Sequence, residues 1–525
     1  MRILVADPVD EGCLGILRND GFEVHFKPGM SELELCEIIP HYDALIVRSG
    51  TKVSAEVIRS ASKLRVIARA GAGVDNIDVD AATRRGIVVM NTPGGSTIST
   101  AEHTLSLLFS LARNIPQANA ALKNGNWERE KFIGVELFGK TIGIIGLGKV
   151  GREVAKRCHA LGMTVIGYDP ILSSEVAMKM GVELVDSEEI YRRSDFITVH
   201  VPLTPETRKM INEDVIKRCK RGVRIINAAR GGIVDEEALL QALNSGRVAS
   251  AALDVFVQEP PGKNPLLQHE NVIVTPHLGA STEEAQEKVS AQIASQVADA
   301  LKERGLSGIV NAVALQQSLR EEIRPYAVLA EKMGSLVAQL MRGKLRHMTI
   351  ALSGELLQTS RELLKAATLK GCFSHLMSEA VNYVNAPVIA AEMGVFVNEK
   401  MEREAENYIH LFTVEYETDK ESRSLSGTVF AHSNPRLVRI DGFYFEVKPE
   451  GHLLFYSNID RPGMLASVGL VLAKANINIA GLSLGRVEDE KRALTIMSID
   501  SDIPDSVLHQ ITQIEGVSEA KVVYL

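Results

Sequence analysis

Three ionisable side chains follow apolar runs of the chain, and together they could manage one carboxylate and one proton. Arg230 follows the run 223–227, Glu259 precedes two prolines, and His277 follows a Thr-Pro pair. An arginine can grip a carboxylate with two hydrogen bonds and polarise a neighbouring carbonyl group. A histidine exchanges a proton with an alcohol near neutral pH, and a carboxylate bonded to it fixes its orientation and favours its protonated form. The trio suits a 2-hydroxy acid, which gains or loses one hydride and one proton.

Each of these three residues has a simpler explanation when it is considered alone. An arginine in a glycine-rich loop is often a surface charge, a glutamate before prolines is usually solvated, and a histidine after proline often only completes a loop. Their shared place after successive strands of one domain favours the chemical interpretation, because binding residues gather at the carboxyl ends of parallel strands.

A glycine-rich turn predicts where a dinucleotide binds. Gly146, Gly148 and Gly151 fit G-x-G-x-x-G between an apolar run and a helical run, 152–161. Gly146 permits a tight turn, Gly148 lets the backbone approach a pyrophosphate, and Gly151 lets the helix pack closely against the strand. The first turn of the helix then offers free N–H groups to the phosphates. The alternative is a glycine-rich turn in some other doubly wound domain.

An acidic residue follows the next apolar run at the position that the fingerprint requires. Asp169 comes directly after the run 164–168. Its carboxylate can accept hydrogen bonds from ribose hydroxyls and would repel a phosphate added to that ribose. The sequence therefore predicts NAD, rather than NADP, as the cofactor.

The bulk composition narrows the class of protein. The chain has 525 residues, 45% hydrophobic and 24% charged, which predicts several globular domains. A net charge of −8 without a basic block gives no sign of nucleic-acid binding. The five scattered cysteines form no C-x-x-C pair, which argues against disulfides or a metal site. With no signal peptide and no membrane-spanning run expected, we predict a cytoplasmic protein.

The elements that must position these residues divide the chain into four parts. Short strands and helices alternate over 1–98, and a helix is expected over 100–113, capped by Ser99 or Thr100. Six strands with intervening helices are predicted in the dinucleotide domain, at 142–145, 164–168, 196–201, 223–227, 249–253 and 272–275. Between 312 and 450, helical runs are expected at 318–341, 354–369 and 372–393, followed by strands. Residues 451–525 read as βαββαβ.

The first 310 residues resemble the D-isomer-specific 2-hydroxyacid dehydrogenases. The matching segments are 69–78 (Arg-Ala-Gly-Ala-Gly-Val-Asp-Asn-Ile-Asp), the fingerprint, 200–204 (His-Val-Pro-Leu-Thr), 227–232 (Asn-Ala-Ala-Arg-Gly-Gly) and 276–280 (Pro-His-Leu-Gly-Ala). The resemblance implies that Arg230, Glu259 and His277 are the catalytic residues of an oxidoreductase and that Asp254 contacts the nicotinamide amide. The other positions that match cofactor-lining residues of the family are Lys149, Val150, Val201, Pro202, Thr204, Ala228, Ala229, Leu278, Gly279 and Ala280, together with Arg230 and His277 themselves.

The same resemblance implies the fold and the substrate side of the site. The fold class is α/β, with two Rossmann-like or flavodoxin-like lobes, then an α+β intervening domain and a βαββαβ domain. The substrate lobe would be 1–98 plus 291–311, and the NAD lobe 99–290. Substrate binding falls to two loops of the first lobe, with the residues Arg48, Thr51, Arg69, Gly71, Ala72 and Gly73. The segment 127–131 matches one that reaches a partner subunit in relatives.

The tail of the chain narrows the substrate. Residues 451–525 resemble an ACT domain, in which Asn458, Asp460 and Asn478 match positions that bind serine in relatives. With the intervening domain 312–450, the chain resembles the long members of the family that oxidise 3-phosphoglycerate in L-serine biosynthesis, expected as homotetramers. Alternatives remain another D-2-hydroxyacid reductase, acting on hydroxypyruvate or glyoxylate, or a non-catalytic NAD-sensing protein of the corepressor kind. The Asp-Arg-Pro-Gly turn at 460–463 could also serve only to shape a strand–helix junction.

Overall fold

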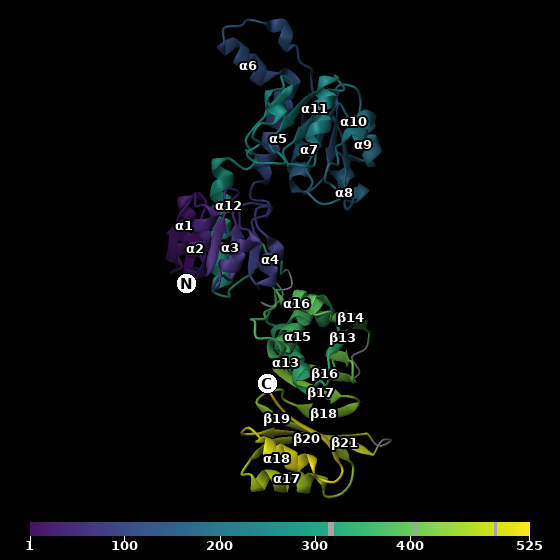
Figure 1. Cartoon of the computed structure of the whole chain (residues 1–525). Helices are drawn as coiled ribbons and strands as arrows, with labels where there is room; N and C mark the ends of the chain where they lie inside the picture. The colour runs from purple at the N-terminus through teal and green to yellow at the C-terminus, as the bar shows by residue number, and fades with distance from the viewer. Residues whose placement is uncertain (313–314, 316–319, 404–406, 488–490) are drawn as a thin grey trace. The chain divides into compact units, whose positions relative to one another are not determined.

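The computed structural model describes the chain apart from residues 313–314, 316–319, 404–406 and 488–490. It divides into two compact units (Figure 1). One unit holds Met1–Pro8, Leu14–Asn91 and Ile293–Leu525, and the other holds Val9–Cys13 and Thr92–Gln292. Within the described ranges, no helix is both long enough and apolar enough to span a membrane.

The first lobe is built on a parallel sheet of five strands in the order β2-β1-β3-β4-β5. The strands are β1 (Arg2–Val5), β2 (Glu23–Phe26), β3 (Ala44–Val47), β4 (Val66–Arg69) and β5 (Val88–Asn91). The helices are α1 (Glu11–Asn19), α2 (Glu32–Ile38), η1 (Ile39–His41), α3 (Ala55–Ser60) and α4 (Val79–Arg84). β3 and β4 are buried along their whole length, as expected of parallel strands covered on both faces. The edge strand β2 is exposed at both ends and partly buried between them, and its sequence lacks the continuous apolar run from which the buried strands could be predicted.

The dinucleotide unit is a parallel sheet of seven described strands in the order β12-β11-β10-β9-β6-β7-β8. The strands are β6 (Thr141–Ile145), β7 (Thr164–Tyr168), β8 (Glu183–Leu184), β9 (Phe196–Val199), β10 (Val223–Asn227), β11 (Val248–Leu253) and β12 (Val272–Val274). The prediction of six strands missed β8, because two residues are too short for a pattern. The strand order reverses between β6 and β9, and ligands of such sheets bind outside the carboxyl ends of the strands at that point.

The helices of this unit follow the predicted runs with shifted ends. They are α5 (Thr97–Arg113), α6 (Ile115–Lys123), η2 (Arg129–Phe132), α7 (Lys149–Ala160), α8 (Ser174–Lys179), α9 (Ser187–Arg193), α10 (Glu213–Arg218), α11 (Glu236–Asn244), η3 (Pro265–Gln268) and α12 (Glu283–Leu301). The predicted start of α5 was wrong. Thr100 lies inside the first turn, where its N–H and its hydroxyl both donate to the carbonyl of Ser96 at 3.0 and 2.9 Å.

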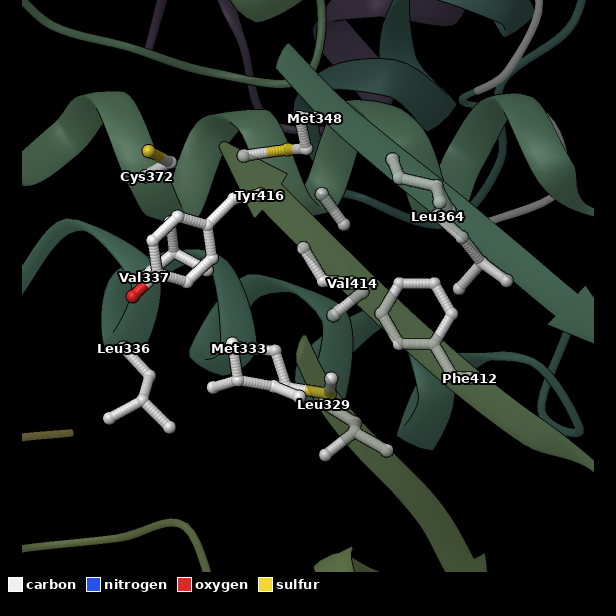
Figure 2. Close-up of a cluster of buried hydrophobic side chains, with 14 of the residues drawn as sticks. Leu329, Met333, Leu336, Val337, Met348, Leu364, Cys372, Phe412, Val414 and Tyr416 are labelled. Carbon is white, nitrogen blue, oxygen red and sulfur yellow. The ribbon is translucent and has the colours of Figure 1, made fainter. Parts of the chain in front are cut away.

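The intervening domain packs helices against a mixed sheet of six described strands, β14-β13-β15-β16-β17-β18. The strands are β13 (Leu345–Ser353), β14 (Phe396–Glu402), β15 (Leu411–Thr418), β16 (Ser422–Phe430), β17 (Asn434–Ile440) and β18 (Phe443–Val447). The helices are α13 (Arg324–Leu340), α14 (Glu355–Thr359), α15 (Arg361–Leu376) and α16 (Ala386–Glu392). Figure 2 shows side chains of α13 and α15, among them Met333 and Leu364, meeting Val414 of β15 in one buried cluster.

The predicted helix break between 369 and 372 was wrong. A single helix, α15, runs through Gly371, which lies where α15 crosses α13. A Cβ at Gly371 would sit 1.8 Å from the carbonyl oxygen of Glu331, and one at Gly334 would sit 1.9 Å from that of Thr368. These glycines let two helix backbones approach each other, so Gly371 is a packing residue and not a helix breaker.

The C-terminal domain has the predicted βαββαβ order, with an antiparallel sheet β20-β21-β19-β22. Its elements are β19 (His452–Ile459), α17 (Met464–Lys474), β20 (Ile479–Val487), β21 (Arg492–Ile499), α18 (Asp505–Thr512) and β22 (Val517–Tyr524). Alternate residues of β19 divide between two cores. Leu454 packs under α17 and α18, whereas Leu453 joins the core of the intervening domain. The two C-terminal domains therefore share buried surface.

Candidate active site

The glycine turn between β6 and α7 has the geometry that a pyrophosphate needs. Gly146 has a φ of +92°, which favours glycine. A Cβ at Gly151 would lie 2.0 Å from the carbonyl oxygen of Gly146, so helix and turn touch. A Cβ at Gly148 would meet no heavy atom within 4 Å, and Gly148 is the N-cap of α7. The turn thus leaves open space in front of a helix N-terminus, which fits a bound dinucleotide.

Asp169 is held beside this turn at the end of β7. Its Oδ2 accepts a hydrogen bond from Leu147 N at 2.9 Å, and its Oδ1 accepts from Ile171 N and Leu172 N at 2.9 and 3.1 Å. Partial burial raises the pKa of Asp169, but these backbone hydrogen bonds outweigh burial and lower the pKa below its ordinary value. The site therefore presents an ionised, oriented carboxylate, which suits ribose hydroxyls and disfavours a 2′-phosphate.

Glu259 and His277 come together although 18 residues separate them in sequence. Oε2 of Glu259 lies 2.8 Å from Nδ1 of His277, and Oε1 accepts from Phe256 N at 3.1 Å. Burial raises the pKa of Glu259, but the hydrogen bond and charge of His277 bring it below its ordinary value. About a third of each side chain remains exposed, 38% and 36%. The pair can receive a proton from a ligand and stabilise the resulting charge.

Arg230 lies in a loop that is fixed by Asn227, the last residue of β10. Asn227 Nδ2 donates to the carbonyl of Arg230 at 2.9 Å, and its Oδ1 accepts from Ala229 N at 3.1 Å. A Cβ at Gly231 would lie 1.8 Å from the carbonyl oxygen of Phe256. The loop of Arg230 therefore runs against the loop that ends in Glu259, and the structure brings all three predicted loops to one edge of the sheet.

Asp254, at the end of β11, ties the loop after β12 to the sheet. Its buried carboxylate accepts from Thr275 Oγ1 at 2.6 Å, Leu278 N at 2.7 Å and Gly279 N at 2.9 Å. His103 of α5 reaches the same carboxylate, with Nε2 3.1 Å from Oδ1. No sequence pattern points to His103, because Asp254 lies far from it along the chain and only the folded structure brings the two together.

The remaining cofactor-lining candidates begin α7 or lie on loops of the same unit. A Cβ at Gly146 would lie 2.6 Å from the carbonyl oxygen of His200, which places the loop after β9 against the turn. In that loop Thr207 Oγ1 bridges Thr204 N and the carbonyl of Pro202 at 2.7 and 2.6 Å. Lys149 Nζ donates to Pro93 O at 3.2 Å. Val150, Val201, Ala228, Ala229 and Ala280 are buried or half-buried in the same unit.

The candidate phosphate-binding residues lie in the other unit, on the loop after β3, at the end of β4 and on the loop that follows β4. Asp7 organises the first loop: Oδ2 accepts from Arg48 N at 2.5 Å, and Oδ1 accepts from the hydroxyl of Thr51 at 2.8 Å. Thr51 is buried and its hydroxyl is already used by Asp7. Arg69 Nη1 lies 3.7 Å from Asp75 Oδ2, next to the loop Gly71, Ala72 and Gly73.

Two of the candidate effector residues, Asn458 and Asp460, lie just before α17, whereas Asn478 lies at the other end of this sheet, beside Asp500. Asn458 is buried in β19 and donates to Ile459 O at 2.7 Å, while Asn478 Nδ2 donates to Asp500 Oδ2 at 2.6 Å. Asp460 Oδ2 lies 3.5 Å from Nε of Arg486. Gly463 has a φ of +91° and begins the helix, so the Asp-Arg-Pro-Gly turn does shape this junction.

The described part of the chain shows no cluster of side chains that could bind a metal ion. No group of three or more His, Cys, Asp or Glu side chains is arranged there to hold a metal ion. The five cysteines are all free.

Comparison with known proteins places the chain in a family. Residues 105–279 match the NAD binding domain of D-isomer specific 2-hydroxyacid dehydrogenases, 322–441 the D-3-phosphoglycerate dehydrogenase intervening domain, and 452–516 the ACT domain. The D-3-phosphoglycerate dehydrogenase of Archaeoglobus fulgidus is 44% identical over 528 residues, covering 100% of both chains. This chain belongs to the D-3-phosphoglycerate dehydrogenase family.

Two further relatives are also similar to this chain. The D-3-phosphoglycerate dehydrogenase of Bacillus subtilis is 40% identical and covers 100% of this chain and 99% of its own. The structure of D-lactate dehydrogenase from Aquifex aeolicus, complexed with NAD and lactic acid, is 29% identical with a TM-score of 0.53, over 58% of this chain and 96% of that one. The chain is an NAD-dependent oxidoreductase of the D-3-phosphoglycerate dehydrogenase family, with the α/β fold class expected from its sequence.

Proposed function

We propose that this protein oxidises D-3-phosphoglycerate to 3-phosphohydroxypyruvate with NAD, the first step of phosphorylated L-serine biosynthesis. The observation that supports this most directly is the Glu259–His277 pair, 2.8 Å apart in the unit that holds the glycine turn. An acid–base pair in a dinucleotide-binding unit is what oxidation of an alcohol needs. The full-length relatives named for this activity supply the substrate.

The proposed chemistry is shared among three side chains. Arg230 binds the C1 carboxylate of the substrate through its guanidinium group. His277 takes the proton of the C2 hydroxyl on Nε2, because Glu259 occupies Nδ1. Glu259 orients the ring and stabilises the imidazolium that forms. Bound NAD would supply the hydride acceptor, so the substrate would lose one proton to His277 and, from C2, a hydride with its two electrons.

The cofactor would be held by the loops around the glycine turn. The turn residues Gly146, Gly148 and Gly151 face the pyrophosphate, and Asp169 binds the adenosine ribose. Asp254 acts at the nicotinamide end. We assign the surrounding contacts to Lys149, Val150, Val201, Pro202, Thr204, Ala228, Ala229, Leu278, Gly279 and Ala280.

The substrate phosphate needs cations, and two loops of the first lobe provide them. Arg48 and Arg69 are the proposed phosphate ligands, because guanidinium groups pair with phosphate oxygens in bidentate fashion. Backbone N–H groups of Gly71, Ala72 and Gly73 would assist. Thr51 donates to Asp7 through both its backbone N–H and its hydroxyl, so it would act by holding the loop of Arg48 in place.

We assign four parts to the chain: a substrate lobe at 1–98 with 291–311, an NAD lobe at 99–290, an intervening domain at 312–450 and an ACT domain at 451–525. L-serine is the proposed effector, bound at Asn458, Asp460 and Asn478. We propose a homotetramer, and a cytoplasmic location because all five cysteines are free thiols.

A single comparison tests this function. The oxidation of 3-phosphoglycerate by NAD is measured at millimolar substrate with and without L-serine, beside the reduction of glyoxylate and hydroxypyruvate by NADH. We expect efficient oxidation of 3-phosphoglycerate and inhibition by serine. Faster reduction of glyoxylate would point to another 2-hydroxyacid dehydrogenase, and NAD binding without any turnover would point to a sensing protein. Activity that is indifferent to serine would contradict only the regulatory part.

A further inference from the structure

His103 contacts the buried anion that anchors the catalytic loop. It lies on α5, and its Nε2 is 3.1 Å from Oδ1 of Asp254 and 3.2 Å from Oγ1 of Thr275. The side chain of Asp254 is fully buried, and that of His103 is 17% exposed. A buried carboxylate is costly unless several donors compensate it, and His103 lies where it can be one of those donors.

Asp254 uses its hydrogen bonds to hold the backbone on the carboxyl side of His277. Leu278 N donates to Oδ1 at 2.7 Å, and Gly279 N donates to Oδ2 at 2.9 Å. The carbonyl of Asp254 also accepts from His277 N at 2.9 Å. Burial raises the pKa of Asp254, but the hydrogen bonds from His103, Thr275 and Leu278 bring it below its ordinary value. The ionised carboxylate therefore holds the backbone just after His277, and its bond to the hydroxyl of Thr275 holds the chain just before it.

The backbone of His277 needs such a clamp. Its φ is +55°, in the left-handed region that few residues other than glycine adopt. A conformation of this kind persists only where the surroundings hold it. The helix α5 reaches the same loop a second time, since the hydroxyl of Thr100 donates to Gly279 O at 3.1 Å.

We propose that His103 is a positioning residue, which orients the Asp254 carboxylate and through it the loop that aims His277. The proposal rests on the proposed function, because it takes His277 as the proton acceptor. It adds a residue of α5 to the site and gives Asp254 a task beyond the cofactor. His103 itself touches no reacting atom.

Two matched substitutions test the role of His103. In His103→Gln the side-chain amide N–H lies near the place of Nε2, whereas in His103→Asn it is too short to reach Asp254. We expect His103→Asn to lower kcat for 3-phosphoglycerate oxidation by about 10- to 100-fold, as misplaced catalytic groups do. His103→Gln should stay within about threefold of wild type. His159→Asn, on an exposed part of α7, is the control and should leave kcat unchanged.

The test includes a readout that general destabilisation would not move. In a His277→Ala background, His103→Asn should lower kcat by less than about twofold, because residues that act through one group are not additive. An equal loss in both backgrounds, or a kcat for His103→Asn within twofold of wild type, would overturn the proposal.

Amide hydrogen exchange decides the same question without turnover. His103→Asn should speed the exchange of Leu278 N and Gly279 N, and His103→Gln should not. Unchanged exchange in His103→Asn would overturn the proposal even if the enzyme is active. If the wild type fails to oxidise 3-phosphoglycerate, the proposed function fails, and the exchange measurement still decides whether His103 holds the loop.

Discussion

Glu259 engages His277 at Nδ1, with 2.8 Å between that nitrogen and Oε2 of the carboxylate. The other carboxylate oxygen, Oε1, accepts a hydrogen bond from Phe256 N at 3.1 Å. The carboxylate is thus fixed to its own loop before it fixes the imidazole. One ring nitrogen serves orientation, and Nε2 is left for the exchange of a proton with a ligand.

Removal of the imidazole should stop proton transfer but spare the cofactor. We expect His277→Ala to lower kcat by about 10²- to 10⁴-fold, the usual contribution of a positioned acid–base group. The affinity for NADH, measured by calorimetric titration, should change by less than about threefold, because the glycine turn is untouched. A turnover within threefold of wild type would remove His277 from this role.

Removal of the charge on Glu259 should act through His277. We expect Glu259→Gln to lower kcat by about tenfold or more, because an amide stabilises the imidazolium less and can hold the wrong tautomer. Steady-state kinetics of the double variant with His277→Ala check the coupling. The double variant should be no slower than His277→Ala alone. Independent, multiplied losses would show that Glu259 acts elsewhere.

The carboxylate of Asp169 should set the choice between the two nicotinamide cofactors. In Asp169→Ala the repulsion of a 2′-phosphate and the ribose hydrogen bonds are both lost, so the ratio of kcat/KM for NAD over NADP should fall by about tenfold or more. Glu175→Ala, on an exposed face of α8, is the control. An unchanged ratio in Asp169→Ala would contradict the ribose assignment.

An ion-pair cluster should stabilise the first lobe in a pH-dependent way. Lys302 and Arg304 follow the end of α12. A carboxylate oxygen of Asp20 lies 2.8 Å from Nη2 of Arg304, and one lies 2.9 Å from Nζ of Lys302. Hydrogen bonds from Arg304 and Lys302 lower the pKa of Asp20 from 3.8 to about 2. Because the folded pKa lies below the unfolded one, the stabilisation is complete above 3.8 and is lost as the pH falls towards 2.

Thermal unfolding of Asp20→Asn checks this linkage. Its melting temperature should be lower than that of wild type at pH 7, and the difference should shrink as the pH falls below about 4. Glu37→Gln, an exposed substitution on α2, is the control and should show no such trend. A difference that stays constant from pH 7 to pH 3 would contradict the assignment.

The crossing of α13 and α15 should not tolerate a methyl group. We expect Gly371→Ala to lower the free energy of unfolding by about 1–3 kcal/mol, because the added Cβ meets the backbone of α13. Gly469→Ala is a matched control in the middle of α17, where a Cβ would meet nothing within 4 Å. It should be neutral or stabilising by up to about 1 kcal/mol. Denaturant unfolding followed by circular dichroism compares the two.

The parts of the fold that were predictable have local signals. The strands β6, β7 and β10 are apolar runs with clear ends, and the glycine turn has its own spacing. The βαββαβ order of residues 451–525 follows from short strand-like and helical runs that come in that order. β8 and β2 escaped prediction because a two-residue strand and a half-exposed edge strand have little pattern. The predicted gap between the helical runs 354–369 and 372–393 was wrong at Gly371, because the backbone against which Gly371 packs, at Glu331 on α13, lies 40 residues earlier in the chain.

The sequence by itself determined which residues stand at strand ends, and therefore that Arg230, Glu259 and His277 are candidates for one site. It also determined the cofactor class, since the glycine turn and Asp169 are a local arrangement. Only the tertiary structure decided that Glu259 lies against Nδ1 of His277 and that His103 contacts Asp254. The physical reason is that these contacts join distant elements, α5 and the loops after β11 and β12, whose separation is set by packing of helix and sheet and not by any local pattern.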